Sequence, residues 1–247
     1  MRVLAIETAT PVASVALVDA AGVAASRTLR APMRHLEWVA AAIDGMLRDL
    51  GWGPEAVDAV ASGRGPGGFT GLRIGIATAA AWARARHTPL LGVDTLETLA
   101  CSAAAGGLVV PVLDAHRGEV AAALYRCAPP FEPVCLLPAV VAVPDVVVAE
   151  IRGTLQAEGA VPDGLVVAGA GLARYREQLA ALLGAAGVRQ VIERPDAHPR
   201  AETAGLLARP RLLRGVRDEA ARLLPAYGRR PVARLWQETS PRPGSGG

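Results

Sequence analysis

Alternating apolar residues at the start of the chain predict three consecutive strands. The segments are RVLAIET (2–8), ASVALVDA (13–20) and VAASRTL (23–29), and in each the apolar positions alternate or cluster in the manner of a strand. Asp19 and Gly22 bound a short connection of the kind that closes a hairpin between the second and third segments. We therefore expect an antiparallel meander.

A change to apolar spacings of three and four residues predicts the first helix, residues 33–50. Its apolar stripe comprises Leu36, Val39, Ala40, Ile43, Met46, Leu47 and Leu50. Gly51 then favours the end of the helix. The pattern further predicts a strand at 56–63, a helix at 74–86, a strand at 90–93 and a helix that begins at Asp94 or Thr95. Helix and strand thus alternate up to residue 106.

Strand and helix patterns continue through the second half of the chain. Two strands joined at Asp114–Gly118 are predicted within 108–126, then a strand at 131–138, a strand ending in a glycine turn at 164–171, and helices at 144–155, 172–183 and 201–213. We expect an N-terminal subdomain at 1–106, a degenerate C-terminal subdomain at 107–230, and a flexible tail rich in Arg and Pro at 231–247.

Three antiparallel strands followed by alternating helix and strand are the element order of a ribonuclease-H-like unit. The order resembles that of actin, Hsp70 and sugar kinases, which carry the unit twice. The predicted fold class is therefore α/β, with two ribonuclease-H-like (actin/Hsp70-like) subdomains whose mixed sheets are flanked by helices.

The segment GRGPGGFTGLRIG, Gly63–Gly75, lies at a predicted strand-to-helix turn. Gly63, Gly65 and Gly68 match the G-x-G-x-x-G spacing of dinucleotide sites, but Asp94 comes later than the acidic residue that such sites need. A P-loop is not expected, because the chain contains no lysine. The alternative is a structural turn that seats the following helix against the sheet.

If the segment is a structural turn, its residues set the path of the backbone. The residues of this turn are Gly65, Pro66, Gly67, Gly68, Phe69, Thr70, Gly71 and Arg73. The glycines give the backbone freedom and close approach, Thr70 caps the helix, and Arg73 is an exposed charge on its first turn. The substitution Gly68→Val is accordingly expected to impair folding or the binding of a partner.

The composition indicates the class of protein but does not identify its partners. A hydrophobic fraction of 51% supports a packed core, and the absence of a long uninterrupted apolar run leads us to expect a cytoplasmic protein with no membrane partner. All 26 basic residues are Arg, and the net charge of +3 permits nucleic-acid binding without demonstrating it. Cys101, Cys127 and Cys135 lack C-x-x-C spacing and are predicted to be buried, inert thiols.

Several motifs together resemble one family. The segments IETATPVASVAL, GRGPGGFTGLRIG, DTLETLA and LDAHRGEVAAALY are similar to the bacterial TsaB (YeaZ) family, whose Gcp-like domain belongs to the actin-like (ASKHA) superfamily. The resemblance covers roughly the first 125 residues well and is looser downstream. It implies a part in making N6-threonylcarbamoyladenosine (t6A) in tRNA.

The resemblance also sets expectations about chemistry. The catalytic paralogue, of the TsaD type, binds a metal through an H-x-x-x-H pair. Because His35, His87, His116 and His198 never have this spacing, we expect no metal site and no catalytic residue. Glu7 stands where nucleotide-binding members of the superfamily place an acidic residue, so it is either a nucleotide-binding residue or a plain carboxylate at a strand end.

Asp114, His116 and Glu119 form a second candidate group. Two carboxylates and an imidazole could exchange protons, or Asp114 caps a hairpin turn among exposed polar residues. No G-x-S-x-G elbow is present, and no Cys is placed beside a His, so proteolysis is not expected.

Two of the predicted helices carry a candidate partner interface. Its residues are His35, Trp38, Ala42 and Met46 on the first helix and Gly75, Ala79 and Trp82 on the second. Small residues at spacings of three and four let another helix approach closely. The resemblance implies that these two helices pair with the TsaD-type paralogue, and the alternative is that they simply cover the chain's own sheet.

The expected function is that of a non-catalytic scaffold subunit. The resemblance implies that the TsaD-type paralogue moves the threonylcarbamoyl group from threonylcarbamoyl-adenylate to the tRNA adenosine beside the anticodon, with help from a TsaE-type ATPase. ATP and a metal are expected on those partners, tRNA is reached through the complex, and a homodimer is also possible. The rival interpretation is an independent actin-like ATPase or kinase that uses Glu7 and the glycine loops.

Overall fold

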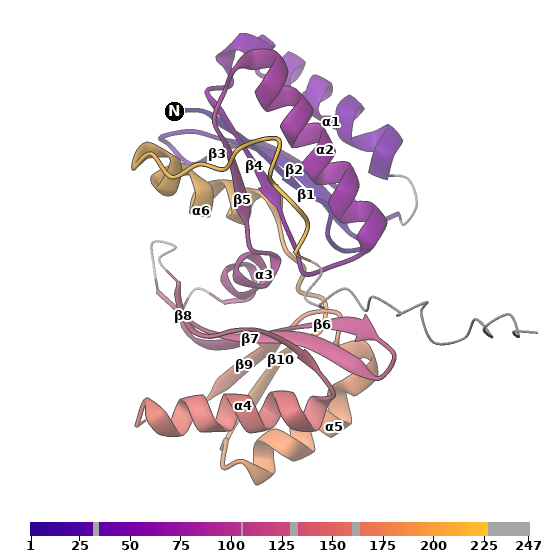
Figure 1. Cartoon of the computed structure of the whole chain (residues 1–247), viewed down its shortest axis with the longest axis vertical. Coiled ribbons are helices and arrows are strands. Elements are labelled where there is room, and N and C mark those ends of the chain that lie inside the picture. The colour runs from indigo at the N-terminus through magenta and orange to yellow at the C-terminus, as the bar shows by residue number, and fades with distance from the viewer. Residues whose placement is uncertain (32–34, 105, 129–132, 160–163, 227–247) are drawn as a thin grey trace, which may run out of the picture.

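The computed structural model describes residues 1–31, 35–104, 106–128, 133–159 and 164–226. They form two lobes, each built on a five-stranded sheet with helices packed against it (Figure 1). The predicted fold, two mixed-sheet α/β subdomains, is confirmed. The predicted tail at 231–247 lies outside the described residues.

The first lobe begins with the predicted meander. Its elements are β1 (Val3–Glu7), β2 (Ala13–Val18), β3 (Val23–Leu29), α1 (His35–Asp49), a short 3-10 helix (Pro54–Ala56), β4 (Ala59–Gly63), α2 (Phe69–Arg86) and β5 (Leu90–Val93). The strand order is β3-β2-β1-β4-β5, with β1 antiparallel to β2 and parallel to β4. Asp19 N donates a hydrogen bond to Gly22 O (2.8 Å), which closes the expected hairpin turn.

The second lobe repeats this plan. Its elements are β6 (Gly107–His116), β7 (Glu119–Cys127), β8 (Val134–Ala142), α4 (Pro144–Ala157), β9 (Leu165–Ala168), α5 (Leu172–Ala185) and β10 (Val191–Arg194). The strand order β8-β7-β6-β9-β10 and the directions of pairing match those of the first sheet. The sequence did not predict β10, because its four residues, VIER, are too few to establish an alternation.

Two further helices connect the lobes. Helix α3 (Thr95–Ala103) lies between them, and α6 (Ala201–Leu213) returns to the first lobe, where it covers the face of the sheet opposite α1 and α2 (Figure 1). Small residues allow this packing, since a Cβ placed on Gly205 would lie 2.6 Å from the Val18 side chain.

The chain beyond α6 also stays with the first lobe. Asp218 N donates to Leu90 O (2.7 Å) at the edge strand β5, and Ala226 N donates to Arg64 O (2.7 Å). The predicted subdomain boundary therefore needs correction, because residues 201–226 pack on the first sheet and not with the rest of 107–230. Sequence patterns gave α6 its bounds but could not show which sheet it covers.

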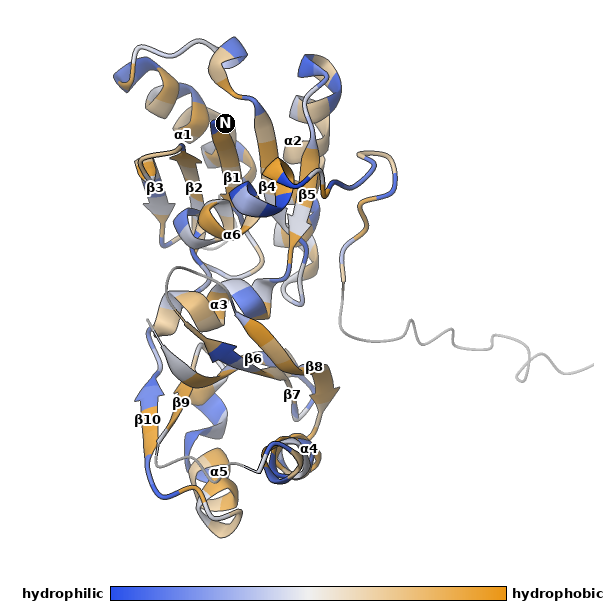
Figure 2. Ribbon diagram, turned by 90° about the vertical axis from the view of Figure 1, so that its left-hand side faces the viewer, coloured by the Kyte–Doolittle hydropathy of each residue, from blue (hydrophilic) through white to orange (hydrophobic). Residues whose placement is uncertain are grey.

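Three apolar clusters form the core, and hydrophobic residues are frequent on the strands that contribute to them (Figure 2). One lies between the first sheet and helices α1 and α2, and another between the second sheet and helices α4 and α5. The third joins the inner faces of both sheets through α3 and α6. The lobes thus share a continuous core.

Several element bounds differ from the predictions. Helix α2 begins at Phe69 instead of 74, and β4 begins at Ala59 instead of 56 because Pro54–Ala56 form a helical turn. Strand β8 runs to Ala142 instead of 138. No helix of the described residues has both the length and the apolar character needed to cross a membrane.

Candidate functional site

The glycine-rich segment packs directly on the connection between β1 and β2. Gly68 N donates to Ala9 O (2.7 Å), and the hydroxyl of Thr8 donates to Gly71 O (2.8 Å). A Cβ on Gly67 would lie 2.4 Å from Ala9 O, and one on Gly71 would lie 2.0 Å from Thr8 O. These two positions must be glycine because main chain meets main chain there.

The close approach extends to both ends of the segment. A Cβ on Gly75 would lie 2.3 Å from the hydroxyl of Thr8, and one on Gly63 would lie 2.2 Å from a carboxylate oxygen of Glu7. Positions 63, 67, 71 and 75 therefore all face residues 7–9, at a regular spacing of four. This spacing was visible in the sequence, but its partner segment was not.

Two expectations about this turn are corrected. Gly68, and not Thr70, is the N-cap of α2, and no side chain caps the helix. A Cβ on Gly68 would approach only Ala9 O, at 3.6 Å, so a side chain has room there and the steric requirement falls on Gly67 and Gly71. Arg73 is exposed, as expected, and its guanidinium lies 3.8 Å from the centre of the Phe69 ring.

The turn is also tied to the helix between the lobes. Gly65 has a positive φ of 108° and is followed by a cis peptide bond to Pro66. Gly65 N donates to the hydroxyl of Thr95 (3.1 Å), and Thr95 N donates to Gly65 O (2.9 Å). The glycine-rich segment thus joins the β1–β2 connection to the start of α3.

Glu7 is fully buried beneath this turn. One carboxylate oxygen accepts a hydrogen bond from Ala9 N (2.8 Å), and the other has no hydrogen-bond partner among the described residues. Burial raises the pKa of Glu7 to about 7, against the lowering effect of the backbone N–H groups of Ala9 and Thr8, and the nearby carboxylate of Asp94 raises it further. The carboxyl group is therefore poised to titrate near neutral pH.

Two backbone N–H groups at this turn are not available to a bound phosphate. A phosphate loop needs free backbone N–H groups that point at the ligand. Here Ala9 N is bonded to Glu7 and Gly68 N is bonded to Ala9 O, and Gly67 and Gly71 meet protein backbone. The arrangement matches the alternative from the sequence, a turn that seats α2 against the sheet.

A cavity of about 540 Å³ lies between the lobes beside this turn. Its lining comprises Thr8, Ala9, Thr10, Pro11, His35, Gly67, Gly68, Phe69, Thr70, Gly71, Ile74, Leu113, Asp114, His116 and Ala170. Apolar groups predominate, and the polar groups come from both lobes. The cavity therefore brings together the glycine-rich segment and the predicted group at Asp114.

Asp114 and His116 do lie together, at the β6–β7 turn. The Asp114 carboxylate accepts a hydrogen bond from His116 N (2.7 Å) and lies 3.8 Å from His116 Nδ1 and 3.9 Å from Arg174 Nη1. His116 and Arg117 have positive φ values of 62° and 55°, and Glu119 is the β-ladder partner of His116. Asp114 thus stabilises a tight turn, which is the plainer of the two interpretations from the sequence.

Much of the predicted partner interface is covered by the chain itself. Ala42, Met46 and Ala79 belong to the core between the first sheet and helices α1 and α2, and Gly75 is buried against Thr8. Their spacing of three and four residues faces the sheet, so the prediction that these side chains reach a partner is corrected. Trp38 and Trp82, which flank that core, remain half-buried.

The exposed apolar residues of α1 and α2 lie at their N-terminal ends. Leu36 is 70% exposed and Phe69 is 54% exposed, although the sequence placed Leu36 in the buried stripe. The two helix ends meet at His35, which is buried, lies 3.3 Å from Pro11 O through its Nε2, and borders the cavity with Phe69. The missed signal was that Leu36 falls one position away from the buried stripe that begins at His35.

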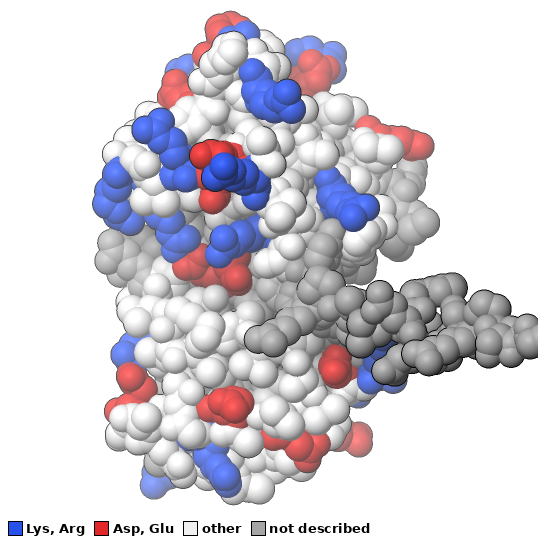
Figure 3. Space-filling model, in the orientation of Figure 1, with Lys and Arg blue, Asp and Glu red and all other residues white. Residues whose placement is uncertain are grey.

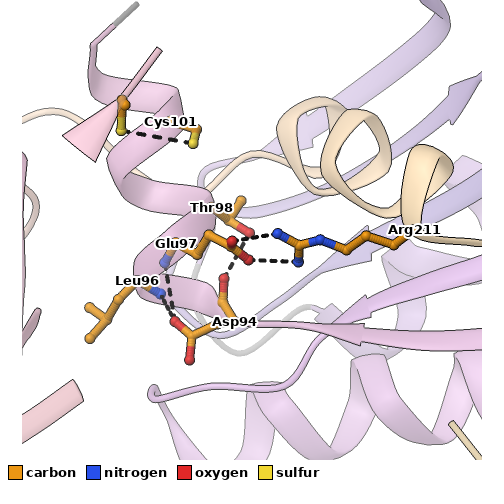
Figure 4. A network of polar contacts seen from close by, with 7 residues as sticks. Asp94, Leu96, Glu97, Thr98, Cys101 and Arg211 are labelled. Atoms are coloured by element: carbon orange, nitrogen blue, oxygen red, sulfur yellow. Dashed lines mark hydrogen bonds and ion pairs between the residues drawn. The ribbon is translucent and has the colours of Figure 1, made fainter. Parts of the chain in front are cut away.

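A side chain of α3, the helix between the lobes, binds α6 of the first lobe (Figure 4). The Asp94 carboxylate accepts hydrogen bonds from Leu96 N (2.8 Å) and Glu97 N (3.1 Å), so Asp94 is the N-cap of α3, which begins at Thr95, one of its two predicted starts. Glu97 binds the guanidinium of Arg211 with both oxygens, at 2.9 and 2.5 Å. This two-point ion pair fixes α6 to the helix between the lobes.

The cysteines differ in their surroundings. Cys101 and Cys127 are buried with their sulfur atoms 4.0 Å apart, and burial together with the contact to Cys127 raises the pKa of the Cys101 thiol. Cys135 is exposed, so the prediction of three buried thiols is wrong for that residue. Within the described ranges, no three His, Cys, Asp or Glu side chains are grouped so that they could hold a metal ion.

The sequence of the chain is similar to those of several known proteins. A family model described as TsaD, tRNA N6-adenosine threonylcarbamoyltransferase, matches residues 28–235. The chain is 40% identical over 129 residues to the tRNA threonylcarbamoyladenosine biosynthesis protein TsaB of Escherichia coli (strain K12), a match that covers 51% of this chain and 55% of that protein. It is 32% identical over 127 residues to TsaB of Bacillus subtilis (strain 168), covering 51% and 56%. The chain thus spans about half the length of these curated relatives.

Solved structures extend the similarity over nearly the whole chain. YeaZ from Pseudomonas aeruginosa has a TM-score of 0.76 and 30% sequence identity, and the match covers 92% of this chain and 99% of that one. A ROK hexokinase from Thermus thermophilus has a TM-score of 0.51 at 12% identity, which is a likeness of fold alone. The architecture is therefore of the actin-like type.

Proposed function

The chain belongs to the TsaB (YeaZ) family, and on that premise we propose that it is a non-catalytic scaffold subunit in the synthesis of t6A in tRNA. It pairs in the cytoplasm with a TsaD-type paralogue, which transfers the threonylcarbamoyl group from threonylcarbamoyl-adenylate to the adenosine beside the anticodon. A TsaE-type ATPase assists, and the ATP and metal belong to these partners. The names of the relatives support this placement in the t6A system.

The observation that carries the pairing is the exposure of large apolar side chains where α1 and α2 begin. Leu36 and Phe69 keep more than half of their surface in water, and the helix ends that carry them meet at His35. Neighbouring exposed apolar side chains on a protein surface mark contact sites. The half-buried Trp38 and Trp82 lie on the same two helices and add partly exposed apolar surface.

Support for a scaffold, as opposed to an enzyme, comes from how the candidate chemical groups are used. The glycine-rich segment packs closely on residues 7–9, Glu7 accepts a hydrogen bond from Ala9 N, and Asp114 accepts one from His116 N within its own turn. The rival function, an independent actin-like ATPase or kinase, relies on these same groups.

The pairing is tested with the double variant Leu36→Asp, Phe69→Asp. Charges at the centre of an apolar contact should weaken binding to the purified TsaD-type protein by at least about tenfold, measured by isothermal titration calorimetry. The control is Val134→Asp, Val146→Asp, which places the same charges on exposed apolar positions of the second lobe. Equal binding by both double variants would exclude the α1–α2 surface, and sedimentation of each would show whether a homodimer uses it.

A further inference from the structure

The positive charge of the chain is concentrated near its C-terminus. Residues 1–199 contain 16 Arg and 19 acidic residues, whereas residues 200–226 contain six Arg and only three acidic residues. The latter segment comprises α6 and the chain that follows it along the edge of the first sheet. Residues 200–226 therefore carry a net charge of +3, against −3 for residues 1–199.

All three acidic residues of this segment are already engaged. Glu202 pairs with Arg200 (3.2 Å), and Glu219 pairs with Arg222 (3.0 Å). The Asp218 carboxylate accepts a hydrogen bond from Gly92 N (2.7 Å). Each of them therefore has a partner of its own.

Three arginines are left without a carboxylate. Arg211 is held by Glu97, but Arg209, Arg214 and Arg217 form no ion pair within the described part of the chain. Arg214 and Arg217 are exposed, and Arg209 is half-buried with its Nε donating to Met1 O (3.1 Å). Figure 3 shows Arg side chains gathered on the upper lobe, over the region that α6 occupies in Figure 1.

We propose that Arg209, Arg214 and Arg217 bind the phosphate backbone of the tRNA on which the partner acts. Guanidinium groups form paired hydrogen bonds with phosphate oxygens, and uncompensated Arg side chains gain most from releasing the counterions of an RNA. A helix C-terminus also favours Arg, which accounts for the C-cap residue Arg214 but not for Arg209, which precedes the last turn, or Arg217, four residues beyond Leu213. This inference rests on the proposed function.

The location of the three arginines leaves the partner surface free. Helix α6 covers one face of the first sheet, and α1 and α2 cover the other (Figure 1). The chain can therefore hold the TsaD-type subunit on one side and contact RNA on the opposite side. An acidic protein segment is the other occupant that this charge would attract, and RNA is favoured because the proposed function places tRNA in the same complex.

The test uses the assembled complex with the triple variant Arg209→Gln, Arg214→Gln, Arg217→Gln. Binding of fluorescently labelled tRNA is followed by anisotropy between about 50 and 200 mM salt. Loss of three phosphate contacts should reduce the slope of log affinity against log salt by about two to three. The double variant Arg214→Gln, Arg217→Gln, which keeps the bond of Arg209 to Met1, should reduce it by about one to two and guards against a folding defect.

The control removes the same charge elsewhere, with Arg30→Gln, Arg152→Gln, Arg194→Gln on exposed positions. It should keep the wild-type slope. A triple variant that matches this control would overturn the assignment, as would one that keeps its tRNA slope but loses a protein partner, since the surface would then bind acidic protein. Wild-type tRNA modification without this chain would instead contradict the proposed function.

Discussion

In both lobes a strand-to-helix turn brings the start of a helix close to the central strand, but the two turns differ in length. In the second lobe, β9 leads into α5 through a short turn in which Gly171 N donates to Val112 O (3.0 Å). A Cβ on Gly169 would lie 2.5 Å from that same oxygen. Two glycines thus suffice to bring the start of a helix against the central strand.

The corresponding turn of the first lobe, between β4 and α2, does more. Positions 63, 67, 71 and 75 all contact residues 7–9, the turn encloses a buried carboxyl group, and it ends with an exposed aromatic ring at Phe69. Both lobes share one topology, and the additional glycines of the first lobe meet residues 7–9. They seat a longer helix and present its apolar end outward.

The largest expected effect is on the free energy of unfolding, and it differs between these two turns. Gly71→Ala places a Cβ against the main chain at Thr8, where neither segment can yield, and should lower the free energy of unfolding by more than about 3 kcal/mol. Gly171→Ala meets the side chain of Val112 at 2.5 Å but its main chain only at 3.0 Å, so it should cost less than Gly71→Ala. Urea denaturation measures both, and an unchanged midpoint for Gly71→Ala would contradict the close approach.

Glu7 gives the first turn a pH dependence. Because burial raises the pKa of Glu7 from 4.5 to about 7, the folded chain retains a proton that the unfolded chain releases. The free energy of unfolding should therefore fall by about 2 to 3 kcal/mol from pH 5 to pH 8, and stay level above that range. Glu7→Gln removes this titration and should flatten the decline in thermal melts. An equally steep decline in the variant would assign the titration to another group.

The smallest expected effect is at the N-cap of α2. Gly68→Ala adds a side chain where there is room, so it should cost only about 0.5 kcal/mol, the usual preference for Gly over Ala at this position. Urea denaturation beside Gly71→Ala provides the measurement. A loss as large as that at Gly71 would show that the turn is packed more tightly at Gly68 than its distances indicate.

Much of the fold was predictable because the signals were local. Alternation defined β1–β3, and the spacing of apolar residues together with Asp94 or Pro144 fixed the beginnings of α3 and α4. Placement of α6 was not predictable, since its small residues match either sheet until Gly205 is seen against Val18. The strand β10 was too short to leave a pattern.

The candidate site was predictable in kind but not in detail. The sequence favoured a structural role for the glycine-rich segment, but the segment that it touches, residues 7–9, lies more than fifty positions away. The helical spacing of Ala42 and Met46 indicated a packed face without saying that their own sheet fills it. Leu36 was misassigned because an apolar residue adjacent to the buried stripe looks like part of it.

The supporting role is tested most directly by tRNA modification in the reconstituted system, with the TsaD-type and TsaE-type partners and threonylcarbamoyl-adenylate radiolabelled in its threonine part. Glu7→Gln should leave the rate of t6A formation within about twofold of wild type, because the buried turn supplies no chemistry. Leu36→Asp, Phe69→Asp should reduce it at least about tenfold at limiting protein, through lost pairing. The opposite result, inactive Glu7→Gln beside a fully active double variant, would contradict a scaffold and place the reaction within this chain.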